Sequence, residues 1–267
     1  MRPELLLFDI GNTSVKLGLA DKSGVSSSYS LPADTAQTAD SLGLTLLALL
    51  RHAGVDARSL AACAASSVVP SFDPLLREAL ERYVAKPLLF ALKDLSVPLK
   101  NLYNRPEEVG ADRLVGAHAA RELYPEAPAL IVVDFGTAVT FDCLRADEYL
   151  GGLIFPGPLT AMNALSRETA KLPRVDLDVR ATEPAPGRDT ATSLRHGLVF
   201  GFVCMVEGLA AKLASGLPKP CPVLGTGGFA PAIARLSGVF ERVLPDLVLE
   251  GLRRLYYGAG QRDLGRK

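Results

Sequence analysis

The sequence predicts an α/β protein made of two similar halves. Apolar strand-like segments alternate with helix-like segments along the chain, which favours the α/β class. A strand, an Asp-x-Gly turn and a second strand occur near the N-terminus and again near the middle. At roughly 100–200 residues per domain, a chain of 267 residues is long enough for two domains. We therefore expect two lobes, residues 1–115 and 116–267, with a cleft between them.

The first half predicts a hairpin followed by helices and short strands. Leu5–Asp9 is a short apolar strand, and the alternating run from Ser14 to Ala20 is its partner across the turn. The remaining predicted elements are a helix over 35–53, a buried strand within 60–69, a helix over 72–84, a strand over 88–90, a loop over 96–109 and a helix over 111–124.

The second half repeats the hairpin and then becomes mainly helical. An apolar strand over 130–134 ends in Asp-x-Gly, and an alternating strand over 139–144 follows. The remaining predictions are turns at 151–152 and 156–158, a helix over 159–169, an irregular proline-rich stretch over 173–187, a helix over 190–215, a strand at 223–224 before a glycine turn over 225–228, and helices over 231–236 and 247–257.

Composition argues against nucleic acid and membranes. Lys and Arg equal Asp and Glu at 29 each, so the net charge offers no excess to neutralise a phosphate backbone. The N-terminus lacks a secretory pattern, and the apolar stretch Leu42–Leu50 is far shorter than the roughly 20 residues that span a bilayer. We expect a cytoplasmic protein without nucleic-acid or membrane partners. The cysteines are too far apart for a metal motif and are predicted to be buried thiols: Cys63, Cys143, Cys204 and Cys221.

The repeated Asp-x-Gly turns have the chemistry of a phosphate site. Asp9-Ile10-Gly11-Asn12-Thr13 corresponds to Asp134-Phe135-Gly136-Thr137-Ala138, and the two aspartates are about half a chain apart. A glycine lets the backbone approach phosphate oxygens, successive turn N–H groups can point at an anion, and the aspartate can hold a metal directly or through water. Each turn alone has an alternative interpretation as an ordinary hairpin turn, since Asp and Gly dominate turns.

Three other nucleotide or hydrolase motifs are missing from the sequence. It contains no Gly-x-x-x-x-Gly-Lys-Ser/Thr P-loop, no Gly-x-Gly-x-x-Gly after a strand and no Gly-x-Ser-x-Gly elbow. A P-loop kinase, a dinucleotide-binding fold and an α/β-hydrolase are therefore disfavoured.

The two hairpins and the late Thr226-Gly227-Gly228 turn resemble the acetate and sugar kinase, heat-shock ATPase and actin superfamily. Over nearly its whole length the chain is similar to type III pantothenate kinases. The motifs that carry this resemblance are the two hairpin turns, Gly110–Arg113, Gly151–Gly157 and Thr226–Gly228. The resemblance implies a duplicated actin-like (ribonuclease H-like) two-lobed fold with an ATP cleft between the lobes. It also implies ATP-dependent phosphorylation of pantothenate to 4'-phosphopantothenate, the first step of coenzyme A biosynthesis.

The resemblance also implies a set of nucleotide and cation ligands. The residues that would bind ATP are Asp9, Gly11, Asn12, Thr13, Lys16, Thr137, Gly227 and Gly228. Asp134 would hold a monovalent cation, K⁺ or NH₄⁺, and Asp9 would contact Mg²⁺ or another divalent ion through water. The family is dimeric, so a homodimer is expected.

On the substrate side, the resemblance implies pantothenate contacts from Tyr103, Gly110, Ala111, Asp112, Arg113 and Thr190. Asp112 would be the catalytic base. Its predicted place in the first turn of a helix favours an ionised carboxylate, which can accept a hydrogen bond from an alcohol and orient it for attack. Two residues depart from the family pattern: Asp189 stands where Asn is usual, and His196 where a small residue is usual.

Two other functions remain open from the sequence. The first is a kinase for another small hydroxyl substrate, which Gly-Ala-Asp-Arg and the short chain disfavour. The second is a non-catalytic ATP-binding accessory or regulatory factor, as some relatives have been regarded. Joint retention of Asp9, Asp112, Asp134 and Thr137 speaks against lost chemistry.

Overall fold

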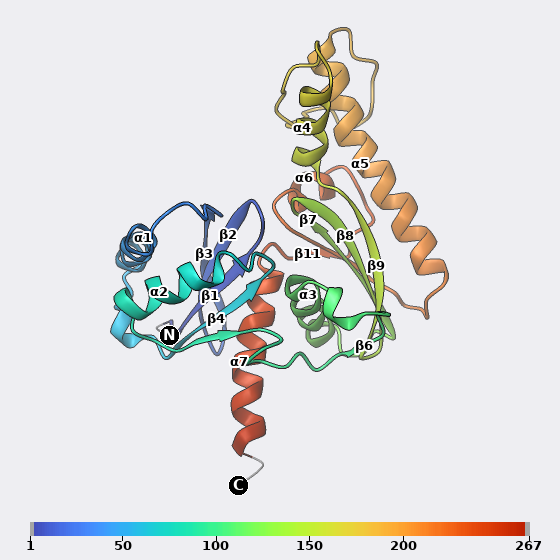
Figure 1. Ribbon diagram of the computed structural model, residues 1–267. Coiled ribbons are helices and arrows are strands. Elements are labelled where there is room, and N and C mark those ends of the chain that lie inside the picture. Colours follow the sequence, from blue (N-terminus) through green and yellow to red (C-terminus); the bar gives the residue numbers. More distant parts are fainter. Residues whose placement is uncertain (1–2, 265–267) are drawn as a thin grey trace. The chain divides into compact units, whose positions relative to one another are not determined.

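The computed structural model describes residues 3–264, with side chains through residue 259 (Figure 1). Backbone contacts divide the chain into two compact units. The first comprises Met1–Leu99, Arg105–Ala119 and Asp246–Lys267, and the second comprises Lys100–Asn104 and Ala120–Pro245. The sequence boundary between residues 115 and 116 differs from this division, because the C-terminal residues group with the first unit.

The first unit contains a five-stranded sheet in the order β3-β2-β1-β4-β5. Its strands are β1 (Leu5–Ile10), β2 (Ser14–Asp21), β3 (Gly24–Pro32), β4 (Ala62–Ser67) and β5 (Leu88–Phe90). β1 pairs antiparallel with β2, which confirms the predicted hairpin, and parallel with β4. Because β1 and β4 are parallel, their carboxyl ends meet at one edge of the sheet. β3 was not predicted.

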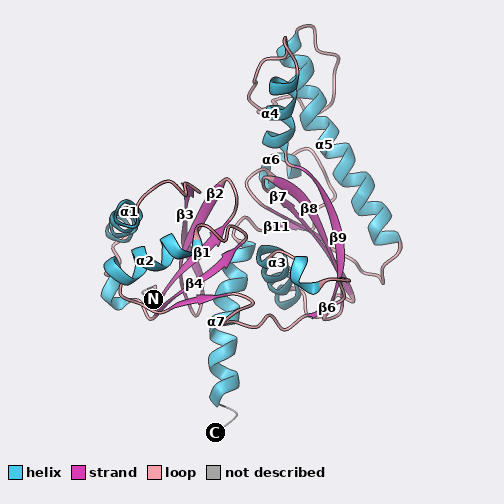
Figure 2. Ribbon diagram, in the orientation of Figure 1, coloured by secondary structure: helices cyan, strands magenta, loops and turns pink. Residues whose placement is uncertain are grey.

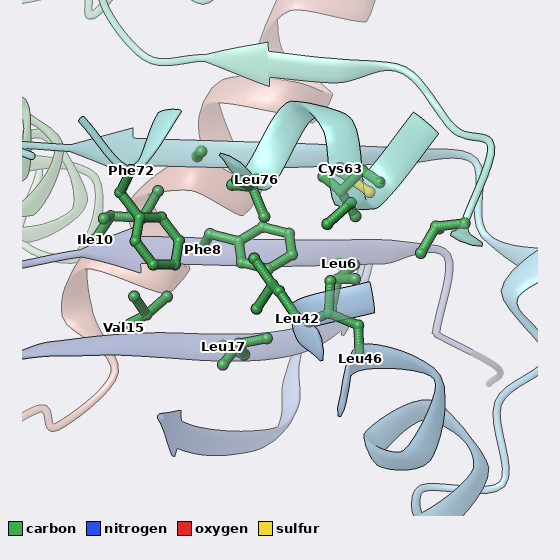
Figure 3. Packing of buried hydrophobic residues seen from close by; sticks show 14 of the residues in the cluster. Leu6, Phe8, Ile10, Val15, Leu17, Leu42, Leu46, Cys63, Phe72 and Leu76 are labelled. Atoms are coloured by element: carbon green, nitrogen blue, oxygen red, sulfur yellow. The ribbon is translucent and has the colours of Figure 1, made fainter. Parts of the chain in front are cut away.

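Helices cover both faces of this first sheet. They are α1 (Ala39–His52), α2 (Asp73–Tyr83), α3 (Ala111–Leu123), whose residues after Ala119 belong to the second unit, and α7 (Leu247–Leu264), with 3₁₀ turns at Ala57–Ser59 and Pro106–Glu108. Successive strand side chains alternate between faces. Leu6 and Phe8 therefore pack in one cluster with Leu42 and Leu76 of α1 and α2 (Figure 3). Leu5 and Leu7 belong to the opposite cluster, with Val115 of α3 and Leu249 and Leu252 of α7.

The second unit contains a six-stranded sheet in the order β11-β10-β7-β8-β9-β6. Its strands, magenta in Figure 2, are β6 (Lys100–Asn101), β7 (Ala129–Phe135), β8 (Ala138–Arg145), β9 (Glu148–Pro156), β10 (Val223–Thr226) and β11 (Arg242–Val243). β7 and β8 form the second predicted hairpin. β10 runs parallel to β7 and places Thr226 beside Asp134.

Three helices complete the second unit: α4 (Pro158–Glu168), α5 (Thr190–Ser215) and α6 (Ala230–Ala234). α5 matches its predicted bounds. Its Phe202, Val203 and Val206 pack with Ile131 and Val133 of β7 in one buried cluster. The predicted irregular stretch before α5 contains no helix or strand.

α5 is also long and apolar enough to cross a membrane by length and composition alone. An 18-residue window within it has a mean hydropathy of 1.7, and 39% of that window is buried in the protein. Leu42–Leu50 was the only candidate span predicted from the sequence, and this helix was missed. Part of its apolar content is accounted for by the core that it forms with β7.

The cysteines differ from the prediction of four buried thiols. Cys63 and Cys143 are buried, Cys221 is half-buried and Cys204, on α5, is exposed. The prediction was wrong for Cys204, which lies on the helix face away from the core. Burial raises the pKa of Cys63 to about 12, so this thiol stays protonated and unreactive.

Candidate active site

The first Asp-x-Gly turn lies at the carboxyl edge of the first sheet. The Gly11 N–H donates to the Ser14 carbonyl oxygen at 3.0 Å and closes the turn. The Thr13 carbonyl accepts from the Ala33 N–H at 3.1 Å, which ties the turn to the end of β3. Asn12 and Thr13 are exposed. The predicted phosphate turn is thus held by backbone bonds and presents its polar residues to solvent.

A polar row crosses this sheet beside the turn. Asp9 is the register partner of Lys16 on β2 and of Ser66 on β4. The Lys16 Nζ lies 2.8 Å from Asp246 Oδ1, just before α7 begins. Lys16, predicted to contact a phosphate, is therefore ion-paired with a carboxylate that the sequence argument did not consider.

Asp112 occupies a tight corner at the start of α3. A Cβ added to Gly110 would lie 2.4 Å from Asp112 Oδ1 and 3.2 Å from Val68 Cγ1, so a side chain here would force the Asp112 carboxylate to move. The Val68 N–H donates to the Ile10 carbonyl at 3.0 Å. The start of α3, the segment after β4 and the end of β1 therefore meet at one edge of the first unit.

Burial controls the ionisation of Asp112. The pKa of its carboxyl is raised above the usual value, chiefly because burial penalises the charged form. The Arg113 N–H donates to Oδ1 at 2.8 Å, and this bond and the Arg113 charge oppose the increase. The stabilisation of the charged carboxylate that we expected from the helix N-terminus is thus smaller than the cost of removing this carboxylate from water.

The second Asp-x-Gly turn contacts the late glycine turn in the second unit. Gly227 has φ +88°, and a Cβ there would lie 2.3 Å from Asp134 Oδ1 and 2.6 Å from the Phe135 nitrogen. Only glycine combines this left-handed backbone with so close an approach. Asp134 and Gly227, predicted from separate motifs, are brought together.

The Thr137 backbone is held by the start of α4. Its carbonyl accepts from the Gly157 N–H at 2.9 Å and from Thr160 Oγ1 at 2.6 Å. A Cβ on Gly157 would lie 2.3 Å from the Gly136 carbonyl oxygen, so Gly157 is another required glycine. The Gly151–Gly157 motif therefore supports the second turn.

Tyr103 and Thr190 lie on other parts of the second unit. The Tyr103 ring packs on Gly151, where a Cβ would lie 3.2 Å from the ring, and its centroid is 6.5 Å from that of Tyr149. The Tyr149 hydroxyl donates to Asp142 at 2.6 Å, which fixes this buried ring. Thr190 is exposed at the first residue of α5.

The two departures from the family pattern both have local structural roles. The Asp189 carboxylate caps α5, accepting from the Thr192 N–H and hydroxyl, each at 2.8 Å, and these bonds lower its pKa. His196 Nδ1 lies 2.9 Å from the Ala185 carbonyl, and its ring stands edge-on to Phe200 at 5.6 Å. His196 therefore fastens the irregular segment to α5.

Sequence reasoning missed two polar residues at the first turn, Ser66 and Asp246. Ser66 lies in a run of small residues, which indicates only a buried strand. Asp246 precedes α7 and has the sequence signal of a helix start. Neither residue is close to a motif in the sequence; only the sheet register brings Ser66 beside Asp9, and only the return of the C-terminus brings Asp246 to Lys16.

The cation-binding predictions rest on single carboxylates. Among the described residues, no three His, Cys, Asp or Glu side chains converge to hold a metal ion. Mg²⁺ commonly keeps several waters and binds through one or two carboxylates plus substrate phosphates. Asp9, at the edge of the phosphate turn, fits that role.

Comparisons with known proteins agree on one family. The family model described as type III pantothenate kinase matches residues 5–212. The chain is 70% identical over 257 residues to a type III pantothenate kinase of Desulfovibrio desulfuricans, covering 96% of this chain and 98% of that protein. It is 58% identical over 262 residues to one of Nitratidesulfovibrio vulgaris, covering 98% and 100%.

Solved structures of distant proteins match the fold. One is component A of the (R)-2-hydroxyglutaryl-CoA dehydratase of Acidaminococcus fermentans, with a TM-score of 0.55 and 16% identity over 96% of this chain and 98% of that one. Another is the ethanolamine utilization protein EutJ of Carboxydothermus hydrogenoformans, with a TM-score of 0.50 and 15% identity over 93% and 88%. The fold is the two-lobed actin-like fold. With its motifs in place and this identity over nearly its whole length, the chain belongs to the type III pantothenate kinase family.

Proposed function

We propose that this chain transfers the γ-phosphoryl group of ATP to the hydroxyl of pantothenate and forms 4'-phosphopantothenate, the first step of coenzyme A biosynthesis. Its 70% identity to a named type III pantothenate kinase carries the proposal. The corner formed by Gly110, Val68 and Asp112 supports it, because that corner fixes a carboxylate beside a phosphate turn.

In the proposed reaction, Asp112 orients the pantothenate hydroxyl. The hydroxyl oxygen bonds to the γ-phosphorus, the bond from that phosphorus to the β–γ bridging oxygen breaks, and ADP leaves. The hydroxyl proton passes to Asp112. A carboxyl with a raised pKa is a better acceptor for this proton than an ordinary aspartate. Phosphoryl transfer depends mainly on positioning and charge stabilisation.

The remaining residues would hold the two substrates. Backbone N–H groups of Gly11–Thr13, with Thr137, Gly227 and Gly228, would face ATP oxygens. Arg113 would pair with the carboxylate of pantothenate, with Tyr103 and Thr190 as further contacts. Lys16 would contact a phosphate by exchanging its partner Asp246.

Two cations complete the proposal. A divalent ion, when bound, neutralises charge on the ATP phosphates, and Asp9 would hold it through water. Asp134 would hold K⁺ or NH₄⁺ beside the glycine turn. Gly227 keeps the backbone tight against this carboxylate, which supports a small, fixed site.

We further propose a cytoplasmic homodimer that buries an apolar face of the second unit. Leu153 and Phe155, on the same face of β9, are 36% and 43% exposed. The ring centroids of Phe155 and of Phe202 on α5 are 5.9 Å apart in an edge-to-face arrangement, so β9 and α5 are neighbours. The exposed residues of α5 include a series of small ones, Gly197, Gly201, Cys204, Gly208 and Ala211, together with the charged Glu207 and Lys212. A surface that joins exposed apolar strand residues to small helix residues is typical of a self-association surface.

The direct test measures ADP release from ATP-Mg²⁺ with and without pantothenate, in potassium and in sodium. We expect ADP formation that depends on pantothenate and falls when sodium replaces potassium. A folded protein that binds ATP but turns over only another hydroxyl substrate would replace the substrate assignment. ATP binding without any turnover would favour an accessory role.

A further inference from the structure

The Ser66 hydroxyl, on β4 of the first sheet, is buried without a hydrogen-bond partner. Ser66 is 0% exposed, and its Oγ has no hydrogen-bond partner among the residues that the structure describes. The adjacent Ser67 Oγ donates to Asp73 and accepts from the Val69 N–H. An unpaired buried hydroxyl destabilises a protein, so its presence calls for a compensating role.

Ser66 lies on the sheet face that carries the candidate site. Ala62 and Ala64, four and two residues earlier on β4, belong to the cluster with Leu5 and Leu7, so Ser66 points to the same face. Its register partner is Asp9, about 4.8 Å away, the usual strand spacing. The hydroxyl therefore neighbours the first phosphate turn.

The first turn of α3 covers this position. At one end, the Asp112 carboxylate and the Val68 side chain both lie close to Gly110, and Val68 is two residues beyond Ser66. At the other end, Val115 of α3 belongs to the cluster that contains Ala64. Ser66 lies between these two points, so it faces the turn that carries Asp112.

We propose that Ser66 is a positioning residue that donates a hydrogen bond to the Asp112 carboxylate in the substrate-loaded enzyme. The proposal rests on the proposed function. Rotation about one side-chain bond redirects the hydroxyl proton and breaks no existing bond, since Ser66 Oγ has none. The bond would hold the carboxylate toward the pantothenate hydroxyl and favour its charged form.

The competing use of the same hydroxyl is a contact with the nucleotide side of the site. Asp9 is the register partner of Ser66 on the neighbouring strand, so a phosphate oxygen or metal-bound water near Asp9 could accept the same proton. In the first case the effect of Ser66→Ala on turnover requires the Asp112 carboxylate, and in the second it requires the nucleotide. A double-mutant cycle separates the two cases.

The experiment compares wild type with Ser66→Ala, Asp112→Asn and the double variant, after wild-type pantothenate-dependent activity has been established. We expect Ser66→Ala to lower kcat about 10- to 100-fold with little change in KM for ATP. In the Asp112→Asn background, adding Ser66→Ala should cause no further loss. Calorimetric titration with ATP-Mg²⁺ should show unchanged affinity for Ser66→Ala.

Thermal unfolding of the free protein supplies a second readout. Ser66→Ala should leave Tm unchanged or higher, because it removes an unpaired buried hydroxyl. Ser67→Ala is the matched control: it should lower Tm through its lost bonds to Asp73 and Val69 and keep kcat near wild type. Ser66→Cys, similar in size with a weaker donor, should have intermediate kcat.

Several outcomes would overturn the proposal. One is a wild-type kcat in Ser66→Ala. The others are a further loss of kcat when Ser66→Ala is added to Asp112→Asn, and a weakened affinity of Ser66→Ala for ATP-Mg²⁺. Either of these last two outcomes would assign the hydroxyl to the nucleotide. Lower Tm with lost activity would make Ser66 structural. An inactive but folded wild type would overturn the proposed function itself, which is distinct from a failure of the cycle.

Discussion

Asp112 is a residue where stability and function make opposite demands. Its raised pKa means that the folded protein holds the proton more tightly than the unfolded chain does. The stabilisation that this provides is present below the unfolded-state pKa and is lost as pH rises through the folded-state pKa. At neutral pH the buried carboxylate is therefore a cost to folding.

Asp112→Asn should separate the two demands. We expect kcat to fall about 100-fold or more, because the proton acceptor is lost. Tm at pH 7–8 should stay equal or increase, because an amide of the same shape carries no buried charge. Turnover with pantothenate and a thermal melt are the measurements. Wild-type turnover would remove Asp112 from the base role, and a lower Tm would contradict the electrostatic argument.

Gly227 and Gly228 form a matched pair of test sites. Gly227→Ala should cost at least about 1 kcal/mol of unfolding free energy, because alanine resists the φ of +88° and its Cβ would collide with Asp134. Gly228→Ala should leave stability unchanged, since a Cβ there meets no atom within 4 Å. Denaturant unfolding of both variants tests this. Equal stabilities would contradict the close approach of the glycine turn.

At the scale of the element, β9 and α5 together form the surface proposed for the homodimer. Leu153→Asp should shift the protein toward monomer in analytical ultracentrifugation, because a charge would be desolvated in the interface. Leu44→Asp on α1 is the control, since Leu44 is also an exposed leucine, at 59%, and lies on the other unit. Dissociation by the Leu44 variant alone would move the interface to α1.

Most elements could be predicted from local patterns, and the misses have physical causes. β3 was missed because its exposed serines break the apolar alternation that marks a strand. β9 was missed because Gly151, Gly152 and Pro156 look like turn residues. Gly151 instead sits at a register shift with φ +108°, beside Tyr103. Helix bounds were closer, and α1 begins later than predicted because Thr38 caps it.

The candidate site was predictable wherever a motif is contiguous in sequence. The two Asp-x-Gly turns and the Gly110–Arg113 corner were placed from sequence, and the structure brings Asp134 to Gly227. The pairing of Lys16 with Asp246 depends on residues far apart in the chain, and no local pattern records it. The unpaired state of Ser66 is likewise a property of packing and not of sequence.

At the scale of the whole molecule, the first unit is built from both ends of the chain. Leu249 of α7 is fully buried, and a Cβ on Gly18 of β2 would lie 2.9 Å from its Cδ1. α7 and α3 together cover one face of the first sheet. The grouping of α7 with the first unit follows from this packing.

Leu249→Ala tests which unit α7 stabilises. We expect a loss of about 2–5 kcal/mol, the usual cost of truncating a buried leucine. Hydrogen exchange should lose protection in β1, β2 and β4 while β7 and β8 keep theirs. The reverse pattern would assign α7 to the second unit.

The placement of α7 also determines the order in which the protein can mature on the ribosome. All strands and helices of the second unit have been made once residue 245 emerges, whereas the sheet made first must wait for residues 247–264. At roughly 5–20 residues per second, Leu5, Leu7 and Ala64 stay without α7 for on the order of ten seconds or more. The first sheet is therefore translated first but is the last to have its α7-facing side covered. Its exposed strands are where a chaperone would be needed.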